Sequence, residues 1–434
     1  MSYERKVLVH HSLASIVALG ITGLARLLYS VIIARRFGVE TLGLANALIS
    51  QAFFLAIPLS FFAVAVSKYS AEFLGRNSGE SIRAITLPAF LLPFAGLILL
   101  PFNVYIAMLA VFRGVQLTLR GFLYGIHRGE HYAYIISLAF LGFLVGFLLP
   151  NALAPYILFL GIISALAWAY LLRFRLISRP RGKELRLITS YSTFAFLGTL
   201  SGVFLIQGPY FMSERLSNAE VAGMVSAVLS TVFLLTYLPQ VLQSAIMPLF
   251  SYKHGKNERE YIRRLADEST LFLILVTSAT VFVLMLFGRE LLSLVFDFRI
   301  GPSLYIALMA VEVYIAYNPS IVALNSTSYV KHATAVSLAG ASVALISWFL
   351  LIPAFGDVGV MIGLFLAYAS ILVGVAWLSN RLLQVSPRVY EPLAVSLLLQ
   401  VAVFVSKSVL LAGFIVFLVY ERKNLLRIIS SLGT

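Results

Sequence analysis

The chain is a succession of long apolar segments separated by short polar breaks. A helix needs about 20 apolar residues to cross a bilayer, and most of these segments reach that length. The sequence therefore predicts an all-α polytopic membrane protein with about 12 to 14 transmembrane helices, of which the last two are the shortest. The predicted helices span residues 12–34, 42–66, 84–101, 103–126, 132–149, 155–173, 188–212, 221–247, 268–287, 302–326, 332–353, 358–379, 392–406 and 408–420.

The composition excludes a water-soluble enzyme. Of the 434 residues, 60% are hydrophobic and 12% are charged, and the mean hydropathy is +0.95. Soluble domains carry about 25% charged residues, so this chain has too little polar surface to fold in water. It contains no cysteine, which removes disulfides and thiolate metal sites. It also lacks a P-loop lysine motif and any D-x-D or H-x-x-x-x-D cluster, so we expect no catalytic residue, no metal site and no organic cofactor.

Basic residues are distributed unevenly between the two sides of the predicted bundle. The formal net charge is +14, and with a cytoplasmic N-terminus the loops on that side hold 23 Lys and Arg residues against 6 in the opposite loops. This asymmetry follows the positive-inside rule and predicts a multi-pass protein of the cell membrane with both termini in the cytoplasm. The basic loops then face anionic lipid headgroups, so the net charge needs no nucleic acid to explain it.

An internal repeat divides the chain. The segment 36–50 returns at 215–230 with one insertion, and 107–111 returns at 307–311. Because six helices separate the copies, the sequence predicts two parallel six-helix lobes, at 1–180 and 187–382, with a helix pair at 390–421. The basic stretch 174–186 is the predicted connector. Positions that coincide in the repeat include Gly43 with Gly223, Ala47 with Ala227, and Ser50 with Ser230.

Four ionisable residues lie well inside predicted spans, where each would cost about 2.5 to 3.5 kcal/mol if it faced lipid at a helix centre. They are Arg26, Arg113, Arg120 and Glu312. Arg120 is close enough to the cytoplasmic end to extend its side chain to the headgroups. Arg113 and Glu312 occupy nearly equivalent places in the repeat, so a salt bridge or a gate between the lobes is one interpretation. Glu312 is also the only acid in the first twelve spans that could bind a coupling ion, which we expect to be Na+ or H+.

Polar side chains form stripes on several predicted helices. Gln116 shares a helix face with Arg113 and Arg120, and Gln207 shares one with Tyr210. Such stripes indicate either a hydrated cavity or hydrogen bonds between helices. On the cavity interpretation, the predicted substrate-binding residues are Arg26, Arg113, Gln116, Arg120, Gln207, Tyr210 and Gln240.

The segment Ala34-Arg35-Arg36-Phe37-Gly38-Val39-Glu40-Thr41-Leu42-Gly43, together with the two lobes and the arginines in the spans, carries a family resemblance. It resembles the polysaccharide-transporter branch, Wzx-type flippases of lipid-linked oligosaccharides, within the multidrug/oligosaccharidyl-lipid/polysaccharide exporter superfamily. The resemblance covers most of the chain in layout and about ten residues in motif.

The resemblance implies a V-shaped bundle that works by alternating access and moves a polyprenyl-diphosphate-linked saccharide to the outer leaflet. It also implies an arginine-lined cavity for the diphosphate and a lipid groove formed by the last two helices. We expect such a protein to be a monomer surrounded by membrane lipids.

A drug or small-molecule exporter of the same fold is the alternative. Drug exporters of this superfamily typically use a carboxylate in the first lobe, and this chain has no Asp or Glu inside the spans of that lobe. A cationic cavity attracts phosphate and repels a cationic drug, so the sequence favours the flippase.

Overall fold

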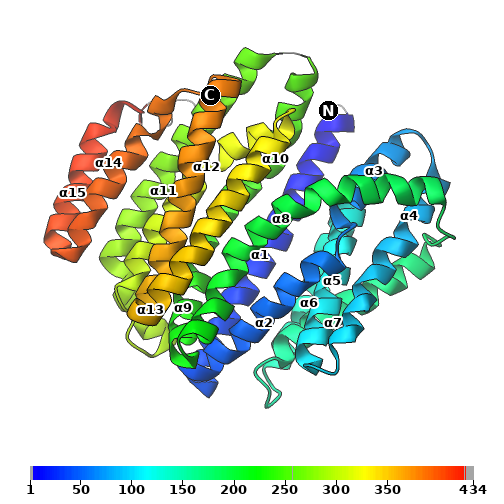
Figure 1. The fold of residues 1–434 in the computed structure, drawn as a ribbon, viewed down its shortest axis with the longest axis horizontal. Coiled ribbons are helices and arrows are strands. Elements are labelled where there is room, and N and C mark those ends of the chain that lie inside the picture. Colours follow the sequence, from blue (N-terminus) through cyan, green and yellow to red (C-terminus); the bar gives the residue numbers. More distant parts are fainter. Residues whose placement is uncertain (1–2, 257, 425, 427–434) are drawn as a thin grey trace. The chain divides into compact units, whose positions relative to one another are not determined.

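The computed structural model describes residues 3–256, 258–424 and 426, and every regular element within them is a helix (Figure 1). The first eight α-helices are α1 (Tyr3–Phe37), α2 (Val39–Leu59), α3 (Ala63–Gly75), α4 (Gly79–Leu91), α5 (Val104–Gly125), α6 (Gly129–Gly146), α7 (Ala154–Arg173) and α8 (Gly182–Leu216). The others are α9 (Ala219–Val232), α10 (Tyr237–Gly255), α11 (Arg259–Phe296), α12 (Ser303–Ser326), α13 (Val330–Leu383), α14 (Glu391–Gln400) and α15 (Lys407–Tyr420). Short 3-10 helices cover Leu92–Leu99, Phe233–Thr236, Pro387–Tyr390 and Val401–Phe404.

The predicted all-helical membrane fold is confirmed. Twelve helical stretches of the described chain are long and apolar enough to cross a membrane. One of them is α13, which Gly356 divides into two segments through a backbone with φ 55° and ψ −128°. These segments match the two helices predicted at 332–353 and 358–379. With the shorter apolar helix α15, every predicted span corresponds to helical structure.

One helix boundary was predicted wrongly. The span expected over 42–66 ends at Leu59 in α2, and a separate helix, α3, begins at Ala63. The linking residues 60–62 form a turn in which the Ser60 hydroxyl and backbone N–H both donate to the Ala56 carbonyl, at 2.8 Å each. Hydropathy does not detect this turn, because the residues on both sides of it are apolar.

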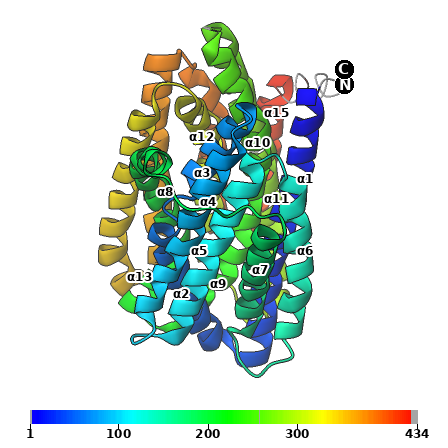
Figure 2. The ribbon, with the colours of Figure 1, turned by 90° about the vertical axis from the view of Figure 1, so that its right-hand side faces the viewer.

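The chain divides into two units between Gly223 and Met224. The first unit contains α1 to α8, and the lobe limits predicted from the repeat remain a prediction. In this unit α5 is central, since it packs against α2, α3 and α7, and α6 pairs with α1 and α7 (Figure 2). The start of α5 is fixed by Asn103, whose side-chain oxygen accepts the Ile106 N–H at 3.0 Å.

Two glycines that coincide in the sequence repeat meet in the first unit. A Cβ atom on Gly43 would lie 1.9 Å from the Ala219 carbonyl oxygen, and one on Gly223 would lie 2.1 Å from the Val39 carbonyl oxygen. The backbones at the start of α2 and of α9 therefore approach too closely for any side chain between them. This contact explains why both copies of the repeat have glycine at this place.

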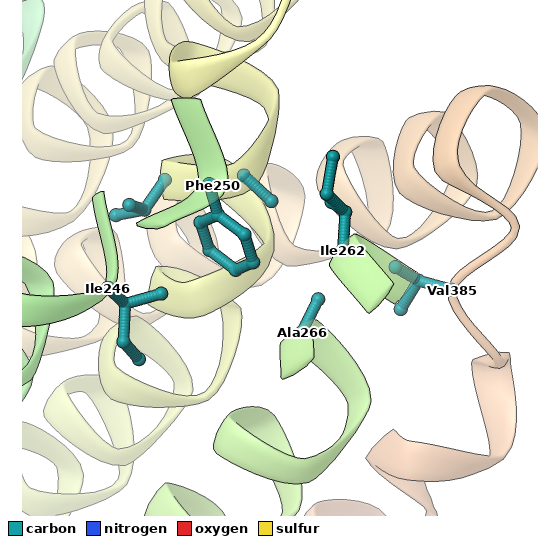
Figure 3. Packing of buried hydrophobic residues seen from close by; sticks show 7 residues of the cluster. Ile246, Phe250, Ile262, Ala266 and Val385 are labelled. Carbon is teal, nitrogen blue, oxygen red and sulfur yellow. The ribbon is translucent and has the colours of Figure 1, made fainter. Parts of the chain in front are cut away.

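In the second unit, α12 is the central helix. It packs against α10, α11, α13 and α14, and 83% of its most apolar stretch is buried. At one end of α12 a cluster of apolar side chains joins three helices to the segment after α13 (Figure 3). Phe250 of α10 is fully buried there among Ile262 and Ala266 of α11 and Val385. The helix pair α14 and α15 packs against α11, with α14 also touching α12.

Candidate functional site

In the first unit, Arg26 of α1 meets Tyr210 of α8. The Arg26 guanidinium donates a hydrogen bond from Nη2 to the Tyr210 hydroxyl, and its central carbon lies 5.0 Å from the centre of the Tyr210 ring. The Tyr210 side chain is 2% exposed, whereas Arg26 is half-buried. The hydroxyl and the ring of one residue therefore both stabilise the arginine charge inside the bundle.

A second contact joins α8 to α2 one turn away. The Ser50 hydroxyl donates to Gln207 Oε1 at 3.0 Å, and Ser50 is buried while Gln207 is half-buried. Gln207 and Tyr210 stand three residues apart on α8, so they share one face of that helix. The polar stripe expected on this helix is thus directed at α1 and α2.

Arg113 of α5 lies against α2 as well. Its guanidinium carbon is 4.6 Å from the centre of the Phe53 ring, and its Nη1 donates to Gln116 Oε1 at 2.5 Å. Gln116, 1% exposed, donates in turn from Nε2 to the Tyr132 hydroxyl at 3.4 Å. Because Phe53 and Ser50 are three residues apart on α2, one face of that helix touches both the Arg113 group and Gln207.

Five of the seven predicted substrate-binding residues, on α1, α5 and α8, are thus connected through contacts with each other and with side chains of α2. We call these residues the arginine array: Arg26, Arg113, Gln116, Gln207 and Tyr210, with their partners Ser50, Phe53 and Tyr132.

Phe53 and Tyr132 were not among the residues predicted from the sequence. An aromatic residue in an apolar span gives no polar signal, so only the packing of α2 and α6 against α5 reveals their role.

Arg120 lies at the end of the stripe on α5, and its side chain is exposed. Its guanidinium carbon is 6.0 Å from the centre of the Tyr124 ring, and the Tyr124 hydroxyl is 2.9 Å from the Ser15 hydroxyl of α1. This exposure accords with the extension of Arg120 to lipid headgroups that the sequence left open.

Gln240 belongs to the second unit, where its Nε2 donates to the Thr236 hydroxyl at 3.4 Å. The structure shows a local contact for this residue, so its assignment to the substrate site stays a prediction.

The interior of the first unit is cationic. Every acid up to Gly223 lies near the end of a helix, at Glu4, Glu40, Glu72, Glu80, Glu130, Glu184, Glu214 and Glu220. Several of them bind surface arginines, as Glu80 does Arg181 at 2.5 Å. That contact raises the pKa of Arg181, first through the hydrogen bond and then through the charge of Glu80. None of these acids lies near the middle of its helix, where Arg26 and Arg113 lie in theirs.

Glu312 is the buried acid of the second unit, with none of its side chain exposed. Its Oε1 accepts hydrogen bonds from the hydroxyls of Ser278 on α11, at 2.6 Å, and Ser396 on α14, at 2.8 Å. Its Oε2 accepts from Gln400 Nε2, also on α14, at 2.6 Å. The sequence suggested Arg113 as the partner of Glu312, whereas these three donors are neutral. They were not foreseen because nothing in the sequence places α14 beside α12.

Residues 209–353 match the MatE family model. A curated relative, the probable low-salt glycan biosynthesis flippase Agl15 of Haloferax volcanii, is 25% identical over 226 residues. The match covers 49% of this chain and 46% of that protein, so the chain spans about half the length of this relative.

Solved structures share the fold at low sequence identity. A multidrug resistance MATE family transporter of the MOP superfamily, in an inward-facing conformation, has a TM-score of 0.68 at 15% identity, over 85% of this chain and 98% of the other. The lipid II flippase MurJ, in an inward closed conformation, has a TM-score of 0.66 at 12% identity, over 96% of this chain and all of the other. The chain therefore shares the fold of these membrane transporters over most of its length, and residues 209–353 also resemble the MatE family in sequence.

Proposed function

We propose that this transporter is a flippase that moves a polyprenyl-diphosphate-linked saccharide from the cytoplasmic to the outer leaflet by alternating access. The observation that carries the proposal is the arginine array, which holds two guanidinium groups within the helices of a unit whose acids all lie near helix ends. Burying two such charges costs about 2.5 to 3.5 kcal/mol each at mid-membrane, which an anionic ligand would offset.

The array suits a diphosphate for geometric reasons. A guanidinium group has five N–H donors in a planar fork that matches two phosphate oxygens. The Arg113 guanidinium stacks on the Phe53 ring, and its Nη1 donates a hydrogen bond to Gln116 Oε1. These two contacts fix the plane of the guanidinium before a ligand binds. Tyr210 orients Arg26 in the same way.

The names of two similar proteins support the same substrate class. By their names, the Haloferax volcanii protein is a probable flippase of low-salt glycan biosynthesis and MurJ is a flippase of lipid II. A multidrug transporter has a comparable fold, so the alternative is a drug or small-molecule exporter. A cationic substrate would be repelled by the arginine array, which is the reason for preferring the flippase.

The proposal includes the remaining expectations from the sequence. The protein acts as a monomer in the cell membrane, both termini are cytoplasmic, and an ion gradient drives the cycle in place of ATP.

The proposed function is tested in cells that depend on this protein. Depletion should cause a labelled lipid-linked saccharide to accumulate on the inner leaflet. Arg26→Ala and Arg113→Ala should fail to relieve this accumulation while the variants remain in the membrane. The control is Arg76→Ala, since Arg76 is an exposed residue at the end of α3 that pairs with Glu72 at 2.6 Å. Full complementation by both array variants at normal abundance would reject the proposed site.

A further inference from the structure

Tyr29 of α1 has a hydroxyl that the packing of the first unit does not satisfy. Its side chain is 0% exposed, and of the tyrosines that the structure describes it alone has a buried hydroxyl without a hydrogen-bond partner. A buried donor that is left unpaired destabilises a fold, because the hydrogen bond that it forms in water is not replaced. Packing alone therefore does not explain a tyrosine at this position.

The tyrosine hydroxyl cannot find a partner within its own helix. Serine and threonine hydroxyls lie close to the backbone and can donate to a carbonyl one turn earlier, as Thr22 of α1 does to the Ala18 carbonyl at 2.7 Å. The hydroxyl of a tyrosine lies at the far end of the ring, so its partner has to come from another element or from a ligand. The Tyr29 ring itself packs edge-on against Tyr156 of α7, with the ring centroids 4.7 Å apart.

Tyr29 lies beside the arginine array. It follows Arg26 by three residues on α1, so the two side chains are neighbours on one face of that helix. Tyr156, which contacts Tyr29, also packs edge-on against Phe53 of α2, with 6.0 Å between the ring centroids. The guanidinium carbon of Arg113 lies 4.6 Å from the centre of the Phe53 ring. Tyr29 is therefore linked to both guanidinium groups, to one along α1 and to the other through two aromatic rings.

A hydroxyl donor next to two guanidinium groups suits an anionic oxygen. Both guanidinium groups carry a permanent positive charge, which attracts an anion and gives a neutral acceptor no comparable gain. A hydrogen bond from a hydroxyl to a charged oxygen is also shorter and stronger than one between neutral groups. Phosphate oxygens are acceptors of this kind, and a diphosphate has enough of them to accept from two arginines and a hydroxyl at once.

We propose that the Tyr29 hydroxyl donates a hydrogen bond to the diphosphate that the arginine array binds. This inference rests on the proposed function, because it adds a neutral donor to the substrate site proposed there. In this role the hydroxyl contributes to the affinity for the diphosphate and not to the stability of the fold. Removal of the hydroxyl should therefore weaken the complex and leave the protein alone no less stable.

The test uses the full-length protein purified in detergent and farnesyl diphosphate, a soluble isoprenyl diphosphate, as the probe. Binding is measured by isothermal titration calorimetry, and the midpoint of thermal unfolding is measured on the same samples before the probe is added. Tyr29→Phe should weaken binding at least about tenfold, because one hydrogen bond to a charged oxygen is lost. The same variant should unfold at an equal or higher midpoint, because phenylalanine keeps the ring beside Tyr156 without the unpaired hydroxyl.

The matched control is Tyr69→Phe, which should leave the affinity for farnesyl diphosphate unchanged. Tyr69 of α3 is also a buried tyrosine of the first unit, and its ring contacts Phe73 and Tyr191, which lie outside the arginine array. Unchanged affinity in Tyr29→Phe, or a lower unfolding midpoint, would overturn the inference and leave the proposed function intact if Arg113→Ala still abolishes binding. Absence of binding by the unaltered protein would reject the diphosphate site itself, and the inference with it.

Discussion

Replacement of Arg113 by lysine tests whether the arginine array works through geometry or through charge alone. Lysine keeps the positive charge in α5 but offers no planar fork to a phosphate and cannot stack on Phe53 as a guanidinium does. Loss of the stacking at 4.6 Å should cost about 1 kcal/mol, and loss of one of two charge-assisted hydrogen bonds to phosphate about 1.5 kcal/mol. Together these losses of about 2.5 kcal/mol predict a fall in transport of about sixtyfold.

The assay is the initial rate of transfer of a labelled lipid-linked saccharide in proteoliposomes, at substrate concentrations well below half-saturation. Thermal unfolding of each variant is measured in parallel, and we expect the free energy of unfolding to fall by no more than about 1 kcal/mol, the loss of stacking on Phe53, because the charge in α5 is preserved. Arg76→Lys is the matched control at the membrane surface. A rate within twofold of the unaltered protein would refute the reasoning, since it would mean that Arg113 contributes only its charge.

Three further predictions concern packing and topology. Tyr210→Phe keeps the ring beside Arg26 but removes the hydroxyl that accepts its hydrogen bond, so it should lower the free energy of unfolding by about 1.5 to 3 kcal/mol; an unchanged unfolding midpoint would contradict this. Gly43→Ala should reduce the yield of monodisperse protein in size-exclusion chromatography, because its Cβ would collide with the Ala219 carbonyl oxygen. The control is Gly202→Ala, which should leave this yield unchanged because no neighbouring atom lies within 4 Å of the added carbon. Equal behaviour of the two variants would refute the close approach of α2 and α9. Reporter fusions should be cytoplasmic at positions 182 and 256 and external at 152 and 355, and an external reporter at 182 would reject the two-lobe topology.

The helices could be predicted from the sequence because membrane spans depend on local composition. Apolar length alone located every span, including both segments of α13, where Gly356 makes the break. The turn between α2 and α3 was missed because it is stabilised by a hydroxyl and backbone hydrogen bonds of Ser60 within an apolar stretch. Local composition contains no signal for such a turn.

The candidate site was predictable only in part. Arg26 and Arg113 could be predicted as site residues because a charge inside a membrane span is costly. The polar stripe on α8 could be predicted from the helical spacing of Gln207 and Tyr210. The partners of Glu312 did not stand out, because single Ser and Gln residues are common in membrane helices and the placement of α14 depends on tertiary packing. The equivalence of Gly43 and Gly223 was visible in the repeat, but their contact was not.

The proposal that this protein flips a polyprenyl-diphosphate-linked saccharide is tested most directly by measuring that movement in a purified system. The protein is reconstituted into vesicles that contain a fluorescent polyprenyl-diphosphate-linked saccharide in both leaflets, and a membrane-impermeant reagent removes the label from the outer leaflet. The account predicts that the protected fraction falls toward zero with the unaltered protein and stays near one half with Arg113→Ala. Protection near one half with the unaltered protein, in vesicles that do transport a cationic dye, would contradict it.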